Sequence, residues 1–267
     1  MKTDLHTHVK LTSSLPYSPE YVEHMFLAAK QAGLDAICLT EHYGSIGLNS
    51  IYQYIQNSLT KYGDCYLYKG LKVFTGIEVD IAESGHIVVI GALDEILSIY
   101  EELQERGLRK EHPNFEELLN IIKHPSLLTG AAHPFRASDG NLLKLSDDQI
   151  RQLDFVELNG KDYVQDMGNT MALVYALAKR TGLPVVAGSD THCAFQYGCS
   201  ITHFEEDHTT IDGIKHAINQ SAYTIEHTEF AKNQVMMSTQ MKKALIKVHD
   251  LGGDYLSLLT FCPNNNY

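Results

Sequence analysis

The stretch Asp4-Leu5-His6-Thr7-His8 lies close to the start of this 267-residue chain and combines a strand-like pattern with two histidines. Side chains two positions apart on a strand point to the same face, so His6 and His8 would project together, with Leu5 and Thr7 on the other side. Two imidazoles on one rigid strand can chelate a transition metal. The alternative is a pair of incidental histidines near a mobile terminus, and the rest of the chain bears on that choice.

Further histidines and acids stand beside other strand-like runs. The apolar runs 36–40, 73–77, 127–132, 154–156 and 184–189 are followed by Glu41-His42, Glu78, His133-Pro134-Phe135-Arg136, Glu157 and Asp190-Thr191-His192. His86 is the exception, because it opens the run 87–90 instead of following one. The recurrence favours metal ligands over incidental histidines.

Helical periodicity fills most of the intervals between these runs. The helices we expect cover 19–32, 50–60, 95–106, 115–123, 164–181 and 210–219. Strands and helices that alternate in this way predict a parallel sheet with crossover helices. Functional groups in such folds gather beyond the carboxyl ends of the strands. The chain length suits one α/β barrel with a substantial core.

Composition is that of a globular protein, with 44% hydrophobic and 20% charged residues. No apolar run reaches the roughly 18 residues of a membrane span. The first residues lack the apolar segment of a signal peptide. The five cysteines are odd in number and form no Cys-x-x-Cys pair, which favours reduced thiols in a cytoplasmic protein.

The net charge of the chain limits the kind of molecule that it could bind. The formal net charge is -12, which does not suit a long nucleic acid. A small phosphorylated substrate fits better, because bound metals would supply the positive charge.

The C-terminal part predicts a separate element. We expect a barrel over 1–230, a helix over 231–250 and a tail over 251–267 that includes Asn264-Asn265-Asn266. The helix would present an apolar stripe made of Val235, Met236, Met241, Leu245 and Val248. It would pack on the barrel, and a dimer contact is the alternative, so the oligomeric state stays open.

Taken together, these motifs resemble the PHP family, named for polymerase and histidinol phosphatase domains. The family's Asp-x-His-x-His is matched by Asp4, His6 and His8, and its Thr-(Asp/Glu)-His by Thr40-Glu41-His42. Its Gly-x-Glu, its strand-opening His, its Ala-His-Pro and its closing Ser-Asp-x-His are matched by Gly76-Ile77-Glu78, His86, Ala132-His133-Pro134 and Ser189-Asp190-Thr191-His192. The resemblance covers residues 2 to about 227.

The resemblance implies a distorted (β/α)7 barrel with two or three divalent metal ions (Zn, Mn or Fe) at the carboxyl ends of its strands. Carried over position by position, one metal would be held by His6, His8, Glu78 and Asp190. Glu78 would bridge to a second metal, completed by His86 and His133. His42 and His192 would face a third.

The loop after the first strand departs from the family pattern. The family places an Asp or His there, whereas this chain reads Thr12-Ser13-Ser14-Leu15-Pro16-Tyr17-Ser18-Pro19-Glu20. In the register set by Ser18-Pro19-Glu20, Ser14 occupies the ligand position. A neutral hydroxyl is a poor ligand, so we expect a weak third site.

Metal-dependent hydrolysis of a small phosphate ester is the function we predict. A water activated by the metals would attack, Arg136 would hold the phosphate oxygens, and His192 or His42 would protonate the leaving oxygen. A surface ion pair is the alternative for Arg136, and Lys161 is a weaker candidate of the same kind. Glu157 would orient a ligand histidine or be a plain loop carboxylate.

Two other functions stay open. One is an amidohydrolase-type metal hydrolase, which also opens with His-x-His but usually adds a strand-end lysine and a lone closing Asp. The other is a non-catalytic module that binds metal or a phosphorylated ligand and regulates a partner, for which Ser14 is the only support.

Overall fold

Seven strands form a nearly closed barrel in the computed structural model, which describes residues 1–107, 112–136 and 141–259. They are β1 (Lys2–Thr7), β2 (Ala36–His42), β5 (Leu71–Asp80), β6 (His86–Gly91), β7 (Leu128–Ala132), β8 (Phe155–Asn159) and β9 (Val185–Gly188), hydrogen-bonded in that order. An isolated parallel bridge from Thr7 to Thr191 joins the first strand to the segment after the last. The predicted distorted (β/α)7 barrel is confirmed.

The barrel is not wholly parallel, because β6 runs against both of its neighbours. Only five residues, 81–85, separate β5 from β6, whereas a parallel connection needs roughly a dozen. The reversal explains why His86 opens its strand. The start of β6 lies at the same edge of the barrel as the carboxyl ends of the other strands, so His86 faces Asp80 at the end of β5.

Four further strands extend this sheet, and none of them follows from the periodicity. β3 (Thr60–Tyr62) and β4 (Cys65–Tyr68) form a hairpin that adds to β5. β10 (Ser200–Phe204) pairs antiparallel with β1, and β11 (Tyr223–His227) pairs with β10.

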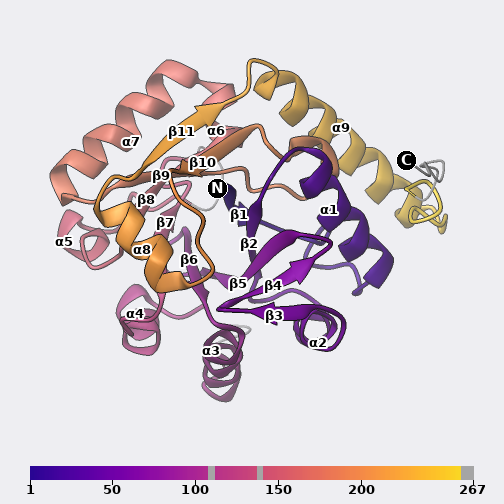
Figure 1. The fold of residues 1–267 in the computed structure, drawn as a ribbon, viewed down its shortest axis with the longest axis horizontal. Coiled ribbons are helices and arrows are strands. Elements are labelled where there is room, and N and C mark those ends of the chain that lie inside the picture. The colour runs from indigo at the N-terminus through magenta and orange to yellow at the C-terminus, as the bar shows by residue number, and fades with distance from the viewer. Residues whose placement is uncertain (108–111, 137–140, 260–267) are drawn as a thin grey trace.

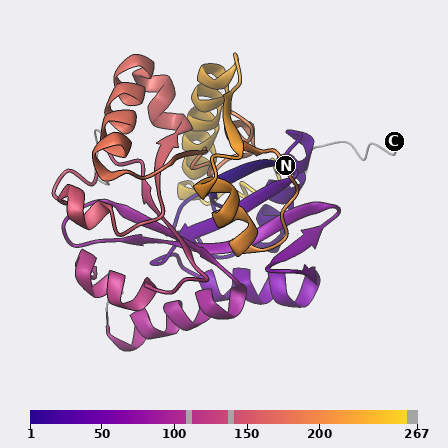
Figure 2. The ribbon, with the colours of Figure 1, turned by 60° about the vertical axis from the view of Figure 1, so that its left-hand side comes forward.

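Helices surround the sheet (Figure 1). They are α1 (Pro19–Gln31), α2 (Leu48–Ser58), α3 (Leu93–Glu105), α4 (Phe115–Ile122), α5 (Asp147–Ile150), α6 (Gly160–Gln165), α7 (Met167–Thr181), α8 (Ile211–Asn219) and α9 (Ala231–Asp250), with a short 3-10 turn, η1 (Ala194–Gln196). In Figure 2, α2, α3 and α4 lie along one side of the sheet, with α7 and α9 on the opposite side. The single helix predicted over 164–181 is wrong, because the chain breaks at Asp166 into α6 and α7.

Two large apolar clusters fill the described part of the molecule, and a small third one joins Cys199 to Ala231 and Val235 of α9. The larger one packs the helices onto the sheet, with Val22, Phe26 and Ile51 among its members. The smaller one includes Phe74, Val88 and residues of α8. Val88 stands opposite Glu78 in the ladder, so this cluster lies on the same face of the sheet as the predicted bridging carboxylate.

The pattern around the first histidines is less regular than expected. The pairing of β1 with β2 shifts register between Asp4 and Thr7. Leu5 lies in the smaller cluster beside Cys38, while Thr7 donates a hydrogen bond to the carbonyl of Cys38 at 2.9 Å. A bulge therefore replaces strict alternation of side chains along this strand.

The apolar stripe expected on α9 is only partly right. Val235 and Leu245 are buried, but Met236 is 57% and Met241 36% exposed, and Ser238 takes a buried position instead. The helix is rotated so that a more polar face meets the barrel. No helix among the described residues is long and apolar enough to cross a membrane. Cys262 and the predicted tail residues 260–267 lie outside the described part of the chain.

Candidate metal centre

All eight predicted ligand side chains gather at one end of the barrel. Six strands (β1, β2, β5, β6, β7 and β9) or the loops that follow them bring these residues together, and Glu78 near the end of β5 lies at their centre. Glu78 is 1% exposed. A carboxylate surrounded by imidazoles in this way is a typical setting for metal ions.

The two oxygens of Glu78 face different sets of histidines. Oε2 lies 3.3 Å from Nε2 of His8 and 3.1 Å from Nδ1 of His42. Oε1 lies 2.8 Å from Nδ1 of His86 and 3.1 Å from Nε2 of His133. This division is the geometry that a bridging carboxylate requires, and the bridging role of Glu78 stays a prediction.

The first predicted site is compact. Ligand atoms of His6, His8, Glu78 and Asp190 all lie within 4.8 Å of one another. Nε2 of His8 is 3.1 Å from Oδ1 of Asp190, and Nε2 of His6 is 3.4 Å from Oε2 of Glu78. All four residues are buried.

The second predicted site contains a close pair of ring nitrogens. Nδ1 of His86 and Nε2 of His133 are 3.2 Å apart, on the Oε1 side of Glu78. His42 also reaches this group, because its ligand atom lies within 4.8 Å of those of Glu78 and His86.

The third predicted site is made of histidines alone. His8 joins His42 and His192 in a group whose ligand atoms lie within 4.8 Å of one another. Ser14 is exposed, and its Oγ is 2.8 Å from Oγ1 of Thr12. The loop residue Ser14 thus adds no ligand here, and the carboxylates nearest to His42 and His192 are those of the other two sites: Oε2 of Glu78 at 3.1 Å from His42 and Oδ1 of Asp190 at 3.9 Å from His192.

Buried carboxylates hold the ligand histidines in place. Glu157 accepts hydrogen bonds at Oε1 from Nδ1 of His6 at 3.0 Å and from the Asn159 amide at 3.1 Å. Its Oε2 accepts from the backbone N–H of His133 at 2.8 Å. A Cβ on Gly188 would come within 2.7 Å of Oε1, so only glycine fits beside this contact. The orienting role for Glu157 thus has the geometry it needs, with the His6 proton on Nδ1 and Nε2 turned to the site.

Two similar carboxylates escaped the sequence interpretation. Oε1 of Glu41 lies 3.5 Å from Nδ1 of His8, and Oδ1 of Asp80 lies 2.8 Å from Nε2 of His86. Asp80 stands two residues after Glu78 on the same strand, so the alternation rule would have placed it on the same face. Glu41 belongs to the Thr40-Glu41-His42 motif, but no local pattern predicts its contact with His8.

Two of the ligand residues have strained backbone. His133 has φ of 29° and Asp190 has φ of 53°, both in the left-handed region that side chains with a Cβ rarely adopt. Such strain costs about 1–3 kcal/mol and persists where the surroundings demand it. His133 directly follows β7, and Asp190 lies two residues after the end of β9, where the chain turns these side chains into the barrel mouth.

Electrostatics at this end favour a cation. Burial opposes charge on His6, but the carboxylates of Glu157 and Glu78 outweigh it and raise the His6 pKa to about 10. Burial likewise opposes the charge of Glu78, yet His42, His6 and His86 hold its pKa well below the usual range. The negative potential that favours a proton on His6 also favours a divalent metal, which would replace that proton.

The residues present fit the metals that the motifs imply. Nδ1 of His8, Oε2 of Glu78 and Nδ1 of His192 are buried without a hydrogen-bond partner. Buried polar atoms of this kind are costly unless something pairs with them. Imidazole and carboxylate are the ligands that Zn, Mn and Fe accept.

Arg136 lies at the site but is already paired. Its Nη1 is 2.7 Å from Oδ2 of Asp190, its Nε is 3.1 Å from Oδ1 of Asp162, and Nη2 donates to the Asn159 amide oxygen at 3.2 Å. The guanidinium is largely buried, so the surface ion pair considered above does not describe it. It holds Asp190 and also borders the cavity that opens onto this centre.

A cavity of about 290 Å³ opens onto this centre. Its lining combines His42, His86, Asp190 and His192 of the centre with Arg136 and Lys161, and α9 closes the opposite side with Ser238, Thr239, Lys242, Lys243 and Ile246. The contribution of α9 could not be found from the sequence, because it depends on how that helix is rotated on the barrel.

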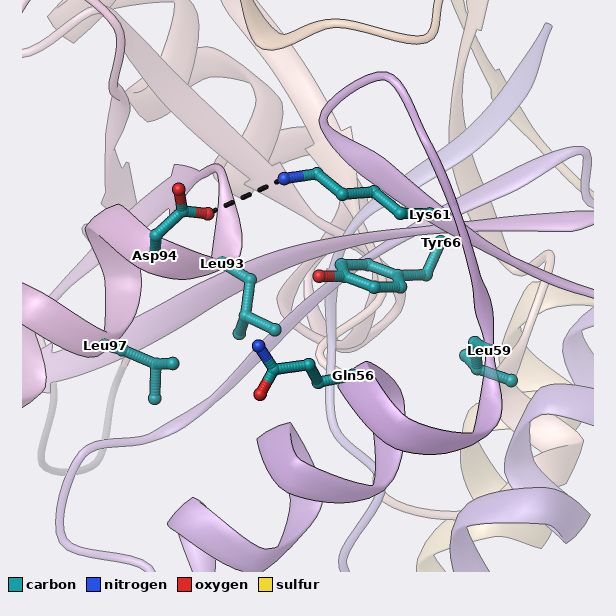
Figure 3. Close-up of a pocket in the computed structure, with 7 residues that line it drawn as sticks. All are labelled: Gln56, Leu59, Lys61, Tyr66, Leu93, Asp94 and Leu97. Carbon is teal, nitrogen blue, oxygen red and sulfur yellow. Dashed lines mark ion pairs between the residues drawn. The ribbon is translucent and has the colours of Figure 1, made fainter.

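A larger hollow of about 450 Å³ lies elsewhere, between α2, the β3–β4 hairpin and α3 (Figure 3). Lys61 and Asp94 form an ion pair of 3.8 Å across it. None of its lining residues belongs to a potential metal-binding group of the described chain.

Comparison with known proteins identifies the family. The PHP domain profile matches residues 4–156. The chain belongs to the PHP family. A second profile, described as PHP-associated, matches residues 169–222. The resemblance is confirmed, and with it the expected class: the protein is a metal-dependent phosphoesterase of the PHP type.

Curated relatives are distant. A probable phosphatase of Acetivibrio thermocellus is 26% identical over 207 residues, which is 73% of this chain and 81% of the relative. A probable phosphatase of Thermoanaerobacter sp. is 22% identical over 213 residues, covering 76% of this chain and 82% of the relative.

Solved structures support the fold alone. PsfC from Pseudomonas syringae has a TM-score of 0.74 at 22% identity, covering 91% of this chain and 98% of PsfC. The lesion-specific endonuclease PfuEndoQ from Pyrococcus furiosus has a TM-score of 0.63 at 20% identity, covering 84% of this chain and 57% of the endonuclease.

Proposed function

We propose that this PHP-type phosphoesterase hydrolyses a small phosphate monoester with two or three divalent metal ions, of Zn, Mn or Fe. The observation that carries the proposal is the division of the two Glu78 oxygens between two sets of histidines at the base of a small cavity. We assign one metal to His6, His8, Glu78 and Asp190, a second to Glu78, His86 and His133, and a weaker third to His42 and His192.

Cations held by these residues would supply the Lewis acidity that activates water and offsets the charge of phosphate oxygens. The chain's own residues position them and the substrate. Glu157 fixes the ring of His6, Glu41 lies beside the ring of His8, and Asp80 fixes that of His86. Arg136 holds Asp190 and presents its remaining N–H groups to a phosphate in the cavity.

The surroundings of both proposed proton donors disfavour a charged imidazole. Burial lowers the pKa of His42, and burial with the charges of His8 and Lys242 holds that of His192 well below the usual value. A neutral imidazole suits metal ligation better than proton donation. We therefore favour the ligand role for His42 and His192, with proton donation only where the third metal is absent.

Substrate size is inferred from the cavity. A volume of about 290 Å³ is at the lower end of small-molecule sites, so it suits a small ester. The net charge of -12 favours such a substrate over long nucleic acid. The similarity to the endonuclease bears on the fold alone and leaves this proposal unchanged. Four free buried cysteines support a cytoplasmic location.

The test combines turnover with metal analysis. The purified protein is assayed on p-nitrophenyl phosphate, on bis(p-nitrophenyl) phosphate and on a p-nitroanilide, before and after treatment with chelator. We expect turnover of the monoester, its loss with chelator and its return with added metal. A preference for the diester would refute the monoester proposal, turnover of the amide alone would favour the amidohydrolase type, and metal binding without any turnover would favour a regulatory module.

A further inference from the structure

One wall of the cavity belongs to a helix that neither family profile covers. The PHP profile ends at residue 156 and the PHP-associated profile at residue 222, whereas α9 spans Ala231–Asp250. Five of its residues line the cavity on the side away from the strand ends. Neither profile therefore describes what α9 contributes to the cavity.

That wall carries cations without counter-ions. Lys161 on α6 and Lys242 and Lys243 on α9 border the cavity. In the described part of the chain, no ion pair or side-chain hydrogen bond involves any of these three ammonium groups, whereas Arg136 beside them is paired with two aspartates.

The lysines also act on one another. Burial, opposed by Asp190 and Glu41, lowers the Lys242 pKa to about 8, and the charge of Lys161 adds to the lowering. Like charges that share a half-buried space repel, and this arrangement is unfavourable until an anion enters. A cationic group on a ligand would add to this repulsion.

Resting on the proposed phosphoesterase function, we infer that the leaving group of the substrate carries its own anionic group, a carboxylate or a second phosphate, which Lys161 and Lys242 bind. The phosphoryl group would lie at the strand ends beside Glu78 and Arg136, and the rest of the ester would extend toward α9. Sugars without acid groups and amino alcohols are then disfavoured as leaving groups.

Three two-carbon esters of similar size test the inference: phosphoglycolate, ethyl phosphate and phosphoethanolamine, with anionic, neutral and cationic tails. We expect kcat/KM to fall in that order. Lys242→Gln should lower kcat/KM about tenfold or more on phosphoglycolate, the scale for a hydrogen bond to a charged group, and change it less than about twofold on ethyl phosphate. Lys247→Gln is the matched control, because Lys247 is exposed on the same helix and lies outside the cavity.

Equal losses on all three esters in Lys242→Gln would show that the lysine binds the phosphoryl group and would overturn the inference. So would equal rates of the wild type on the three esters.

A binding measurement separates this inference from the proposed function. Calorimetry compares phosphonoacetate with ethylphosphonate, which are not hydrolysed, on the metal-free and the metal-loaded protein. We expect tighter binding of phosphonoacetate and loss of that preference in Lys242→Gln but not in Lys247→Gln. If none of the esters is hydrolysed and the binding preference remains, the phosphoesterase proposal fails and the anion site stands. If esters are hydrolysed without any binding preference, the anion site fails alone.

Discussion

Replacing Glu157 by glutamine tests how far one buried carboxylate supports the metal centre. Oε1 accepts from His6 at 3.0 Å and from Asn159 at 3.1 Å, while Oε2 accepts from the His133 backbone at 2.8 Å. Glutamine keeps the volume but has one acceptor oxygen, so its NH2 group must face at least one of these donors in either orientation.

The magnitude follows from these contacts. Glu157→Gln loses one charge-assisted hydrogen bond and places its NH2 group against a buried donor. Together these changes should lower the free energy of unfolding by about 2–4 kcal/mol. The His6 ring also loses the partner that orients it, for which about a 10–100-fold loss of metal affinity is typical. Urea unfolding of the metal-free protein measures the first effect, and competition with a chelator measures the second.

Glu226→Gln is the control for loss of a carboxylate. Glu226 pairs with His203 at 2.6 Å, but its side chain is 44% exposed. We therefore expect the free energy of unfolding to fall by less than about 1 kcal/mol and the metal affinity to stay unchanged. Wild-type metal affinity in Glu157→Gln would refute the orienting role, even if the protein became less stable.

Other changes probe the rest of the centre. The purified protein should hold close to two equivalents of transition metal by elemental analysis, and no uptake of added metal would contradict the assignment. Glu78→Ala should abolish activity and lower metal content, because it removes the shared carboxylate, while Glu157→Ala should be milder; small and equal effects would argue against bridging. Arg136→Ala should lower kcat/KM by an amount that corresponds to about 2–4 kcal/mol of transition-state stabilisation, with metal content unchanged. A parallel fall in metal content would show that Arg136 acts through Asp190. Ser14→Asp should tighten a weak third site in Mn or Zn titrations, and an unchanged titration would mean that the loop register is misplaced.

The sequence predicted the barrel and the gathering of ligands because both depend on local patterns. Each ligand stands next to a short apolar run, and parallel strands bring their carboxyl ends to one edge whatever the details of packing. His6 and Glu78 are far apart in the chain, yet that rule alone places them together. The assignment of each ligand to a particular metal remains a prediction.

Features set by long-range packing were not predictable in this way. The reversal of β6 follows from the short connection before His86. The alternation of strand-like and helical runs predicted a parallel sheet instead. The position of Lys242 depends on the rotation of α9, and an amphipathic pattern with exposed methionines at Met236 and Met241 pointed to the wrong face. The partners of Arg136 come from two other segments of the chain, which no local pattern reveals.

The seam between the first strand and the last has a consequence for how the protein is made. Ser189 donates its backbone N–H to Asp4 at 2.9 Å, Asp190 donates to the carbonyl of His6 at 2.8 Å, and His8 donates to that of Thr191 at 3.0 Å. Contacts between such distant parts of a chain form late, since the loop between them must close first. A chain still emerging from the ribosome thus presents His6 and His8 long before Asp190 exists. The full ligand set proposed for the first metal therefore exists only after the residues that follow β9 have been synthesised.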